Sequence, residues 1–124
     1  MTATVIPTEH QEQCSLFEWA AFQEGFWPEL RLMHAIPNGG KRDKVTAARL
    51  KAEGVKPGVP DICLPVPRGD KHGLYIEMKR RKGGSVSADQ LKWLDNLMRQ
   101  GYECHVCRGC EEARQVILDY LKRD

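Results

Sequence analysis

The 124-residue sequence predicts a single α/β domain in which a small mixed sheet is flanked by helices. Apolar residues recur at helical spacing near both ends of the chain, and short apolar or alternating runs bounded by Gly and Pro lie between them. This alternation of segment types is typical of helices packed on a sheet. A chain of this length supports one hydrophobic core, so we treat residues 1–124 as one domain.

The first half of the chain is predicted to form two helices and one strand. A helix runs from Thr8, which can cap its first turn, to about Glu24, and Gly25 and Pro28 end it. A strand is expected over residues 29–36, closed by turn residues 37–40. A short basic helix over residues 44–53 follows, and the Pro- and Gly-rich residues 55–60 form a loop.

The second half is predicted to form three strands and two helices. Strands over residues 61–66 and 73–79 are joined by a turn-rich linker and are expected to pair as a hairpin. A helix begins at Ser87 and places Leu91, Leu94 and Leu97 on one face, and Gly101 ends it. A strand over residues 102–108 and a helix over residues 111–121 complete the domain.

Charge is strongly segregated along the chain, although the net charge is only +2. Residues 1–40 carry a net charge of −4, residues 41–82 carry +7 and residues 83–124 carry −1. The basic middle segment suits a polyanionic partner, because Lys and Arg neutralise phosphates. A solvated basic face is the alternative. Since no apolar run approaches a membrane span and the N-terminus lacks the pattern of a signal peptide, we expect a cytoplasmic protein with no membrane partner.

The five cysteines are odd in number and unevenly distributed, which favours reduced thiols over a disulfide framework. Cys104, Cys107 and Cys110 have the spacing of half a zinc site, and Cys63 is a possible fourth ligand. His105 would face away from Cys104 on a strand, so it is badly placed to complete the site. We therefore expect packed thiols and no structural zinc.

The most informative pattern is Pro60-Asp61 followed sixteen positions later by Glu77-Met78-Lys79. Glu77 and Lys79 share one face of a strand because the side-chain period is two, and Asp61 begins the neighbouring strand of the hairpin. Carboxylates are the ligands that Mg²⁺ prefers, and a lysine beside a bound metal can orient or deprotonate the attacking water. The alternative is a cross-strand salt bridge on a solvated face.

In this arrangement the motif resembles the core of the PD-(D/E)xK nuclease superfamily, whose fold has a small mixed central sheet flanked by helices. More narrowly, nearly the whole chain resembles the VRR-NUC family of virus-type replication and repair nucleases, in the form of a stand-alone phage-type domain. The resemblance rests on several segments in the right order, namely residues 8–13, 36–42, 48–54, 58–61, 73–79 and 87–93.

The resemblance implies a metal-dependent active site. Asp61 and Glu77 would be the acidic ligands of Mg²⁺ or Mn²⁺, the Met78 carbonyl an additional ligand and Lys79 the catalytic lysine. Glu9 would complete the metal environment, directly or through water.

Glu12 competes with Glu9 for this outlying acidic role. We favour Glu9, because helical spacing groups it with the face that Leu16 and Ala20 bury. Glu12 leads toward Trp19 instead. Both residues also fit a simpler interpretation as exposed glutamates favoured by the dipole of the first helical turn.

The resemblance also places Gln90 near the active site, with a catalytic role. The local pattern Ser87-x-x-Gln90 is a capping box, in which Gln90 would need no chemical role, and we expect that one side chain cannot easily do both. Phosphate contacts are expected from Asn38 in its Asn-Gly-Gly loop and from basic residues on either side of the site. These are Lys41, Arg42, Lys44, Arg80 and Arg81.

The preferred prediction is a Mg²⁺- or Mn²⁺-dependent DNA endonuclease. The resemblance implies a homodimer, and its two-fold symmetry would place two active sites on a branched substrate. We therefore expect cutting of branched DNA such as four-way junctions or flaps. A role in phage or prophage DNA replication, recombination or repair would place it in the bacterial host cytoplasm. The alternative is a non-catalytic nucleic-acid-binding module on the same fold.

Overall fold

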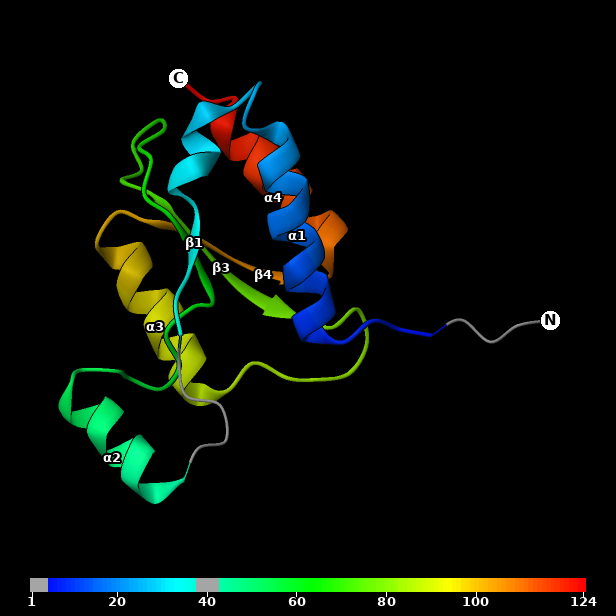
Figure 1. Cartoon of the computed structure of the whole chain (residues 1–124). Coiled ribbons are helices and arrows are strands. Elements are labelled where there is room, and N and C mark those ends of the chain that lie inside the picture. Colours follow the sequence, from blue (N-terminus) through cyan, green and yellow to red (C-terminus); the bar gives the residue numbers. More distant parts are fainter. Residues whose placement is uncertain (1–4, 38–42) are drawn as a thin grey trace.

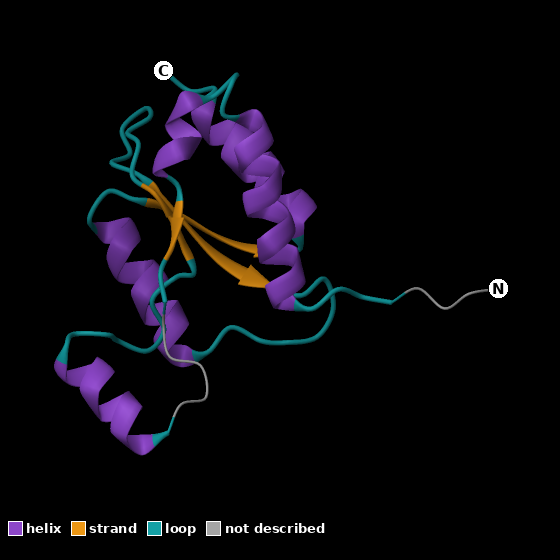
Figure 2. Cartoon of the chain, viewed as in Figure 1, coloured by secondary structure: helices purple, strands orange, loops and turns teal. Residues whose placement is uncertain are grey.

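The computed structural model describes residues 5–37 and 43–124, which form three layers (Figure 1). Helices α1 (Glu9–Gln23) and α4 (Cys110–Leu121) pack together on one face of a four-stranded sheet. Helix α3 (Ala88–Arg99) packs against the other face. Figure 2 shows the strands lying between these two helical layers. The predicted α/β class, with a small mixed sheet flanked by helices, is confirmed.

The sheet has the order β1-β2-β3-β4 and combines antiparallel with parallel pairs. Its strands are β1 (His34–Ala35), β2 (Ile62–Leu64), β3 (Leu74–Lys79) and β4 (Glu103–Arg108). The expected hairpin is present, because β2 pairs antiparallel with β3 and Ile62 lies opposite Ile76. β4 runs parallel to β3, since α3 forms the crossover that a parallel pair requires.

The strand expected over residues 29–36 is wrong for most of its length. Pro28–Leu32 form the 3₁₀ helix η1, and only His34–Ala35 pair in the sheet. Pro28 stands at the start of η1, where its fixed φ suits a helical turn and its missing N–H costs nothing. Leu30 is the buried residue of this helical turn.

The remaining helices match their predicted ranges within about two residues at each end, the usual uncertainty of helix ends. Thr8 caps α1 in a capping box with Gln11. Asp43 caps α2 (Lys44–Ala52) by accepting a hydrogen bond from the Thr46 N–H at 2.8 Å. Within the described parts of the chain, α2 buries none of its residues, and Figure 1 shows it standing away from the body of the molecule. No helix in residues 5–37 and 43–124 is long and apolar enough to cross a membrane.

The two faces of β3 have different tasks. Leu74, Ile76 and Met78 point into the hydrophobic core, whereas Glu77 and Lys79 point to the side on which α3 lies. The core is completed by apolar residues of α1, η1, β2 and α4, including Leu16, Ala20, Leu30, Ile62, Leu64, Ala113, Ile117, Tyr120 and Leu121. A rigid strand therefore carries both polar side chains of the Glu-x-Lys motif.

Candidate active site

The antiparallel register of β2 and β3 brings the two acidic residues of the motif together. Ile62 lies opposite Ile76, so Asp61 falls opposite Glu77, one step further along the pair. The Asp61 carboxylate accepts a hydrogen bond from the Met78 N–H at 2.7 Å. Met78 therefore ties Asp61 to β3 through its backbone, while its own side chain is buried in the core.

The loop before Asp61 is held against α3. Gly58 has φ +86°, and a Cβ there would lie 2.8 Å from the backbone carbon of Asp89, so only glycine fits this approach. One residue earlier, the Pro57 carbonyl accepts a hydrogen bond from the Trp93 Nε1–H at 3.0 Å. The Gly-x-Pro-Asp segment thus enters β2 from a fixed point on α3.

Glu77 is buried with one oxygen partnered and the other not. Its Oε1 accepts a hydrogen bond from the Gln90 side-chain amide at 2.8 Å and lies 3.8 Å from the Lys79 Nζ. Its Oε2 is also buried and has no hydrogen-bond partner in the described residues. Because a buried carboxylate oxygen normally has a partner, this atom is suited to a bound cation.

Gln90 both caps α3 and contacts the Glu-x-Lys residues, two positions of its side chain that were expected to exclude each other. Its Oε1 accepts from the Ser87 N–H at 2.9 Å, which completes the capping box of α3. The same Oε1 accepts from the Lys79 Nζ at 3.1 Å, and the Gln90 Nε2–H donates to Glu77. The expectation that one side chain cannot easily do both is therefore wrong, because the cap itself turns the amide toward β3.

Burial raises the pKa of all three carboxyl groups of this site, and Asp61 further raises the pKa of its two acidic neighbours. Burial, and then the neighbouring Asp61 carboxylate, raise the pKa of Glu77 to about 8. Burial also raises the pKa of Asp61, although the Met78 N–H and Lys79 act in the opposite direction. Partial burial and then Asp61 raise the pKa of Glu9. The site thus disfavours the charged forms of its carboxyl groups, and a positively charged ligand would favour those forms.

Glu12 lies elsewhere and is fully partnered. It is 3% exposed, and its Oε2 accepts hydrogen bonds from the Arg81 Nε–H at 3.2 Å and the Cys110 N–H at 3.1 Å. Its Oε1 accepts from the Arg81 Nη2–H at 3.3 Å. Gly109, with φ +93°, makes room for this carboxylate, because a Cβ there would lie 2.5 Å from Oε2. Glu12 therefore ties α1 to the start of α4.

The face argument made from the sequence for Glu9 is wrong. Glu12, Leu16 and Ala20 form the buried stripe of α1, since they are spaced by four residues, whereas Glu9 is half-buried on a neighbouring stripe. Glu9 nevertheless lies within the electrostatic reach of Asp61 and Lys79. Within the described ranges, no three His, Cys, Asp or Glu side chains form a ready metal cluster, so Asp61 and Glu77 are a pair that Glu9 approaches.

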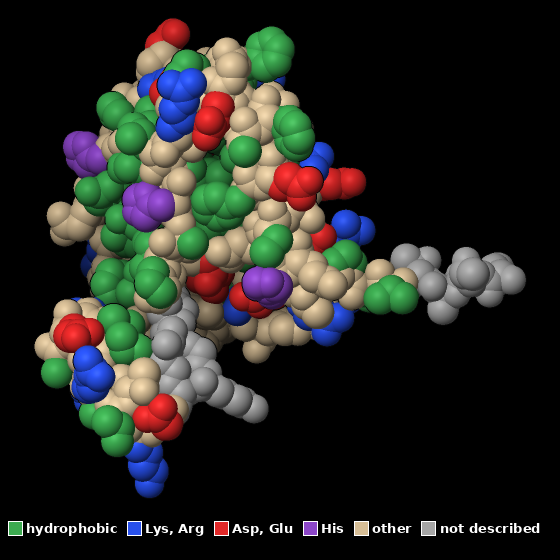
Figure 3. Space-filling model, viewed as in Figure 1, with side chains coloured by type: hydrophobic (Ala, Val, Ile, Leu, Met, Phe, Trp, Pro, Cys, Tyr) green, Lys and Arg blue, Asp and Glu red, His purple; other side chains and the backbone are tan. Residues whose placement is uncertain are grey.

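The expected phosphate-binding residues are distributed unevenly. Asn38, Lys41 and Arg42 lie outside the described residues. Lys44 and Arg80 are exposed, whereas Arg81 is committed to Glu12. Figure 3 shows both basic and acidic side chains on the lobe that contains α2, and further acidic side chains on the nearby part of the body.

Arg108 is a structural residue that the sequence analysis missed. Its guanidinium donates hydrogen bonds to the carbonyls of Arg80 at 3.2 Å, Gly83 at 2.8 Å and Gly84 at 3.3 Å. It stands at the end of β4, directly opposite Lys79 in the parallel pair. Arg108 therefore shapes the basic loop that leaves the candidate active site, and only the β3–β4 register reveals this role.

The cysteines occupy several environments. Cys107 and Cys110 are buried, Cys104 is half-buried, and all five thiols are free. Cys104 and Cys63 flank Tyr75 on neighbouring strands and point to the same face of the sheet. Burial raises the pKa of Cys107 to about 12, which keeps its thiol protonated.

Two comparisons with known proteins bear on the family and the fold of the chain. The sequence model of the VRR-NUC domain matches residues 4–111. A solved structure titled "VRR_NUC domain protein" superposes with a TM-score of 0.82 at 30% sequence identity, covering 95% of this chain and 91% of that chain. No curated protein sequence matches the chain.

Proposed function

Because the chain belongs to the VRR-NUC family and has its nuclease-type fold, we propose that it is a metal-dependent DNA endonuclease. The substrates proposed are branched DNAs such as flaps or four-way junctions, in phage or prophage replication, recombination or repair. The observation that carries the catalytic part is the buried Glu77 Oε2 near Asp61, which has no hydrogen-bond partner among residues 5–37 and 43–124.

The residues present fit a divalent cation. Asp61 and Glu77 would hold Mg²⁺ or Mn²⁺, with the Met78 carbonyl and Glu9 as further candidates for direct or water-mediated contact. Such an ion would polarise the scissile phosphate and lower the pKa of a water molecule. In addition, the cation would offset the burial that raises the pKa of both carboxylates, and the Asp61 charge that raises the pKa of Glu77 further.

Lys79 has the reactive role among the cationic residues near the acidic pair. Its ammonium lies between Gln90 Oε1 and Glu77 Oε1, and its side chain is only 9% exposed. Held in this way, it can donate a hydrogen bond to the attacking water or offset the negative charge that develops on the phosphate. Gln90 acts as a positioning residue, because it orients both Lys79 and Glu77.

DNA would be held by the basic residues on either side of the acidic pair. Lys44 on α2 and Arg80 after β3 are exposed and free to contact phosphates, and Asn38, Lys41 and Arg42 are proposed to join them. We further propose a homodimer, since a two-fold assembly matches the symmetry of a junction. Light scattering at micromolar concentration tests this directly, and a monomer mass removes the argument for paired cuts.

The decisive experiment compares cutting of labelled single-stranded, duplex, flap and four-way-junction DNA by the wild type and Lys79→Ala. Each substrate is incubated with Mg²⁺, Mn²⁺ or EDTA, and binding is measured in parallel. Lys122→Ala is the matched control, because Lys122 is an exposed lysine after α4, away from the site. The proposal predicts metal-dependent cutting that Lys79→Ala abolishes without loss of binding. Binding with no cutting under any metal would instead indicate a nucleic-acid-binding module.

A further inference from the structure

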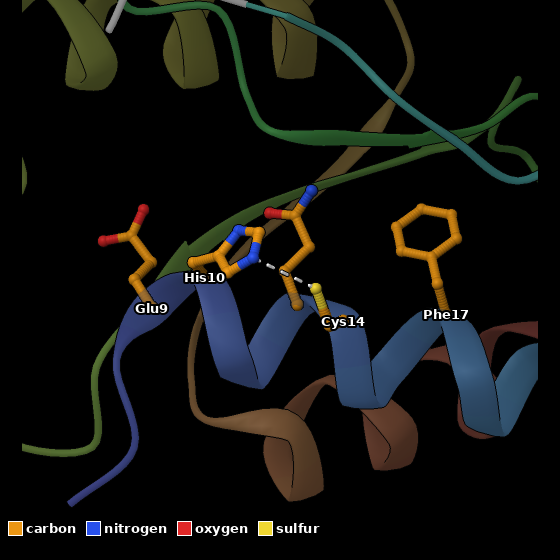
Figure 4. Close-up of a pocket in the computed structure, with 5 residues that line it drawn as sticks. Glu9, His10, Cys14 and Phe17 are labelled. Atoms are coloured by element: carbon orange, nitrogen blue, oxygen red, sulfur yellow. Dashed lines mark hydrogen bonds between the residues drawn. The ribbon is translucent and has the colours of Figure 1, made fainter. Parts of the chain in front are cut away.

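A groove runs along α1 away from the acidic pair, and most of its lining has no part in the proposed mechanism. It has a volume of about 430 Å³ and is lined by Glu9, His10, Gln13, Cys14 and Phe17 (Figure 4). This volume falls in the range of roughly 300–1,000 Å³ that small-ligand sites occupy. The groove is therefore large enough for part of a nucleic acid strand.

The groove begins at the candidate active site. Glu9 forms one end and lies in the electrostatic field of Asp61 and Lys79. Figure 4 shows Phe17 at the other end, with His10 and Cys14 between them, joined by a contact of 3.5 Å. Eight residues of helix separate Glu9 from Phe17, which corresponds to about 12 Å. A strand whose phosphate lay at the acidic pair would thus place its adjoining nucleotide beside this groove.

The chemistry of the lining suits a base better than a phosphate. None of the lining residues in the described chain is Lys or Arg, and Glu9 is acidic. The lining instead offers an aromatic ring, a side-chain amide, an imidazole and a thiol. Phe17 is half-buried and packs against the hydrophobic core, so its ring is held in place while its free surface faces the groove. A fixed aromatic surface of this kind is what stacks an unpaired base.

We propose that this groove binds one unstacked nucleobase of the cleaved strand, with the base stacked on Phe17 and its edge within reach of the Gln13 amide. The inference rests on the proposed function, because the acidic pair must receive the neighbouring phosphate. It predicts contacts with bases that are independent of sequence, since every base has a face that can stack.

The test compares two short single strands of equal length and equal phosphate charge. One is oligothymidylate and the other is the same chain of abasic deoxyribose phosphates. Their ratio of dissociation constants isolates the contribution of the bases from that of the phosphates. All measurements use protein that carries Lys79→Ala, so that nothing is cut. Phe17→Leu removes the aromatic ring, Phe17→Tyr keeps it, and Phe22→Leu is the matched control on the same helix, where Phe22 is 77% exposed outside the groove.

The proposal expects oligothymidylate to bind more tightly than the abasic chain. Phe17→Leu should reduce this preference about tenfold, whereas Phe17→Tyr and Phe22→Leu should preserve it. An unchanged preference in Phe17→Leu, or the absence of any preference in the parent protein, overturns the proposal. The result is separable from the nuclease test. If the protein cuts DNA but Phe17→Leu has no effect on the preference for bases, the nuclease proposal stands and the base-binding proposal is wrong. If Phe17→Leu reduces the preference but the wild type never cuts DNA, the groove binds a base and the nuclease proposal is wrong.

Discussion

The fold buries two carboxylate sites that are partnered in opposite ways. Glu12 receives three hydrogen bonds, from the Arg81 guanidinium and the Cys110 N–H. Glu77 receives one from Gln90, lies beside a second carboxylate, and keeps one buried oxygen without a partner in the described chain. A buried charge is stable when it is fully paired, so the first site holds the fold together. In the second site, a bound cation could supply the partner that Glu77 Oε2 lacks among the described residues, which suits a metal-dependent reaction.

The largest difference between the two sites is expected when each glutamate is replaced by glutamine. Glu77→Gln should lower DNA cutting at least about a hundredfold, because it removes a metal-binding charge. In EDTA it should also raise the melting temperature, because the orphaned carboxylate disappears. Glu12→Gln should lower the free energy of unfolding by about 2 kcal/mol, since hydrogen bonds to a charged group are lost, while most cutting remains.

Initial cutting rates and urea unfolding measure both halves of this prediction. Glu18→Gln is the control for Glu12→Gln, because Glu18 is exposed on the same helix. If Glu12→Gln loses activity as completely as Glu77→Gln while remaining folded, the division into a structural and a catalytic carboxylate is wrong.

Gln90 allows a second test of the comparison, because its side-chain amide donates a hydrogen bond to Glu77. Ser87→Ala removes the capping hydroxyl and should cost about 1 kcal/mol of stability with little effect on cutting. Gln90→Ala removes the donor to Glu77 and the acceptor of Lys79 as well, and should lower cutting by about 10- to 100-fold. Equal activity losses in the two variants, measured at equal folded fractions, would mean that Gln90 serves only the cap.

The Glu77 site should also make the stability of the protein depend on pH. Burial and Asp61 raise the pKa of Glu77 from 4.5 to about 8, so the folded protein binds more protons than the unfolded chain in this window. In EDTA the stability should therefore fall as the pH rises from 4.5 towards 8, and Mg²⁺ should restore it at the upper end. Thermal unfolding at both ends of the window measures this effect. Glu77→Gln should flatten the dependence, whereas an unaltered slope would assign it to other groups.

The smallest effect concerns the arginines that follow β3. Arg80→Ala should reduce the slope of log binding constant against log salt by about one, as expected for one lost phosphate contact. Arg81→Ala should leave this slope unchanged and cost about 1 kcal/mol of stability instead, because its guanidinium is committed to Glu12. DNA-binding titrations over a salt series distinguish the two. A reduced slope in Arg81→Ala would show that Arg81 leaves Glu12 to meet DNA.

Most of the fold could be predicted because its signals are local. Thr8, Asp43 and Ser87 cap the helices that they precede, and the hairpin follows from two apolar segments joined by a turn. Residues 29–36 were the exception, because their alternation favoured a strand while Pro28 began a 3₁₀ turn. Only tertiary packing decides between these two local preferences.

The candidate site was predictable in composition but not in its contacts. The motif brought Asp61, Glu77 and Lys79 together as the hairpin register requires. The hydrogen bond from Arg81 to Glu12 joins residues 69 positions apart in the sequence, so local patterns do not predict it. The double task of Gln90 likewise depends on how α3 crosses β3, which spacing alone does not specify.

The isolated position of helix α2 indicates where the chain can tolerate an insertion. It lies in the chain that joins β1 to β2, which already pair with each other, and none of its residues within the described structure is buried. Lengthening a connection of this kind costs little, because loop-closure entropy grows only slowly with length. An insertion or a reporter tag placed after α2 should therefore leave the β2–β3 hairpin in register and leave Lys44, at the start of α2, in place to contact DNA.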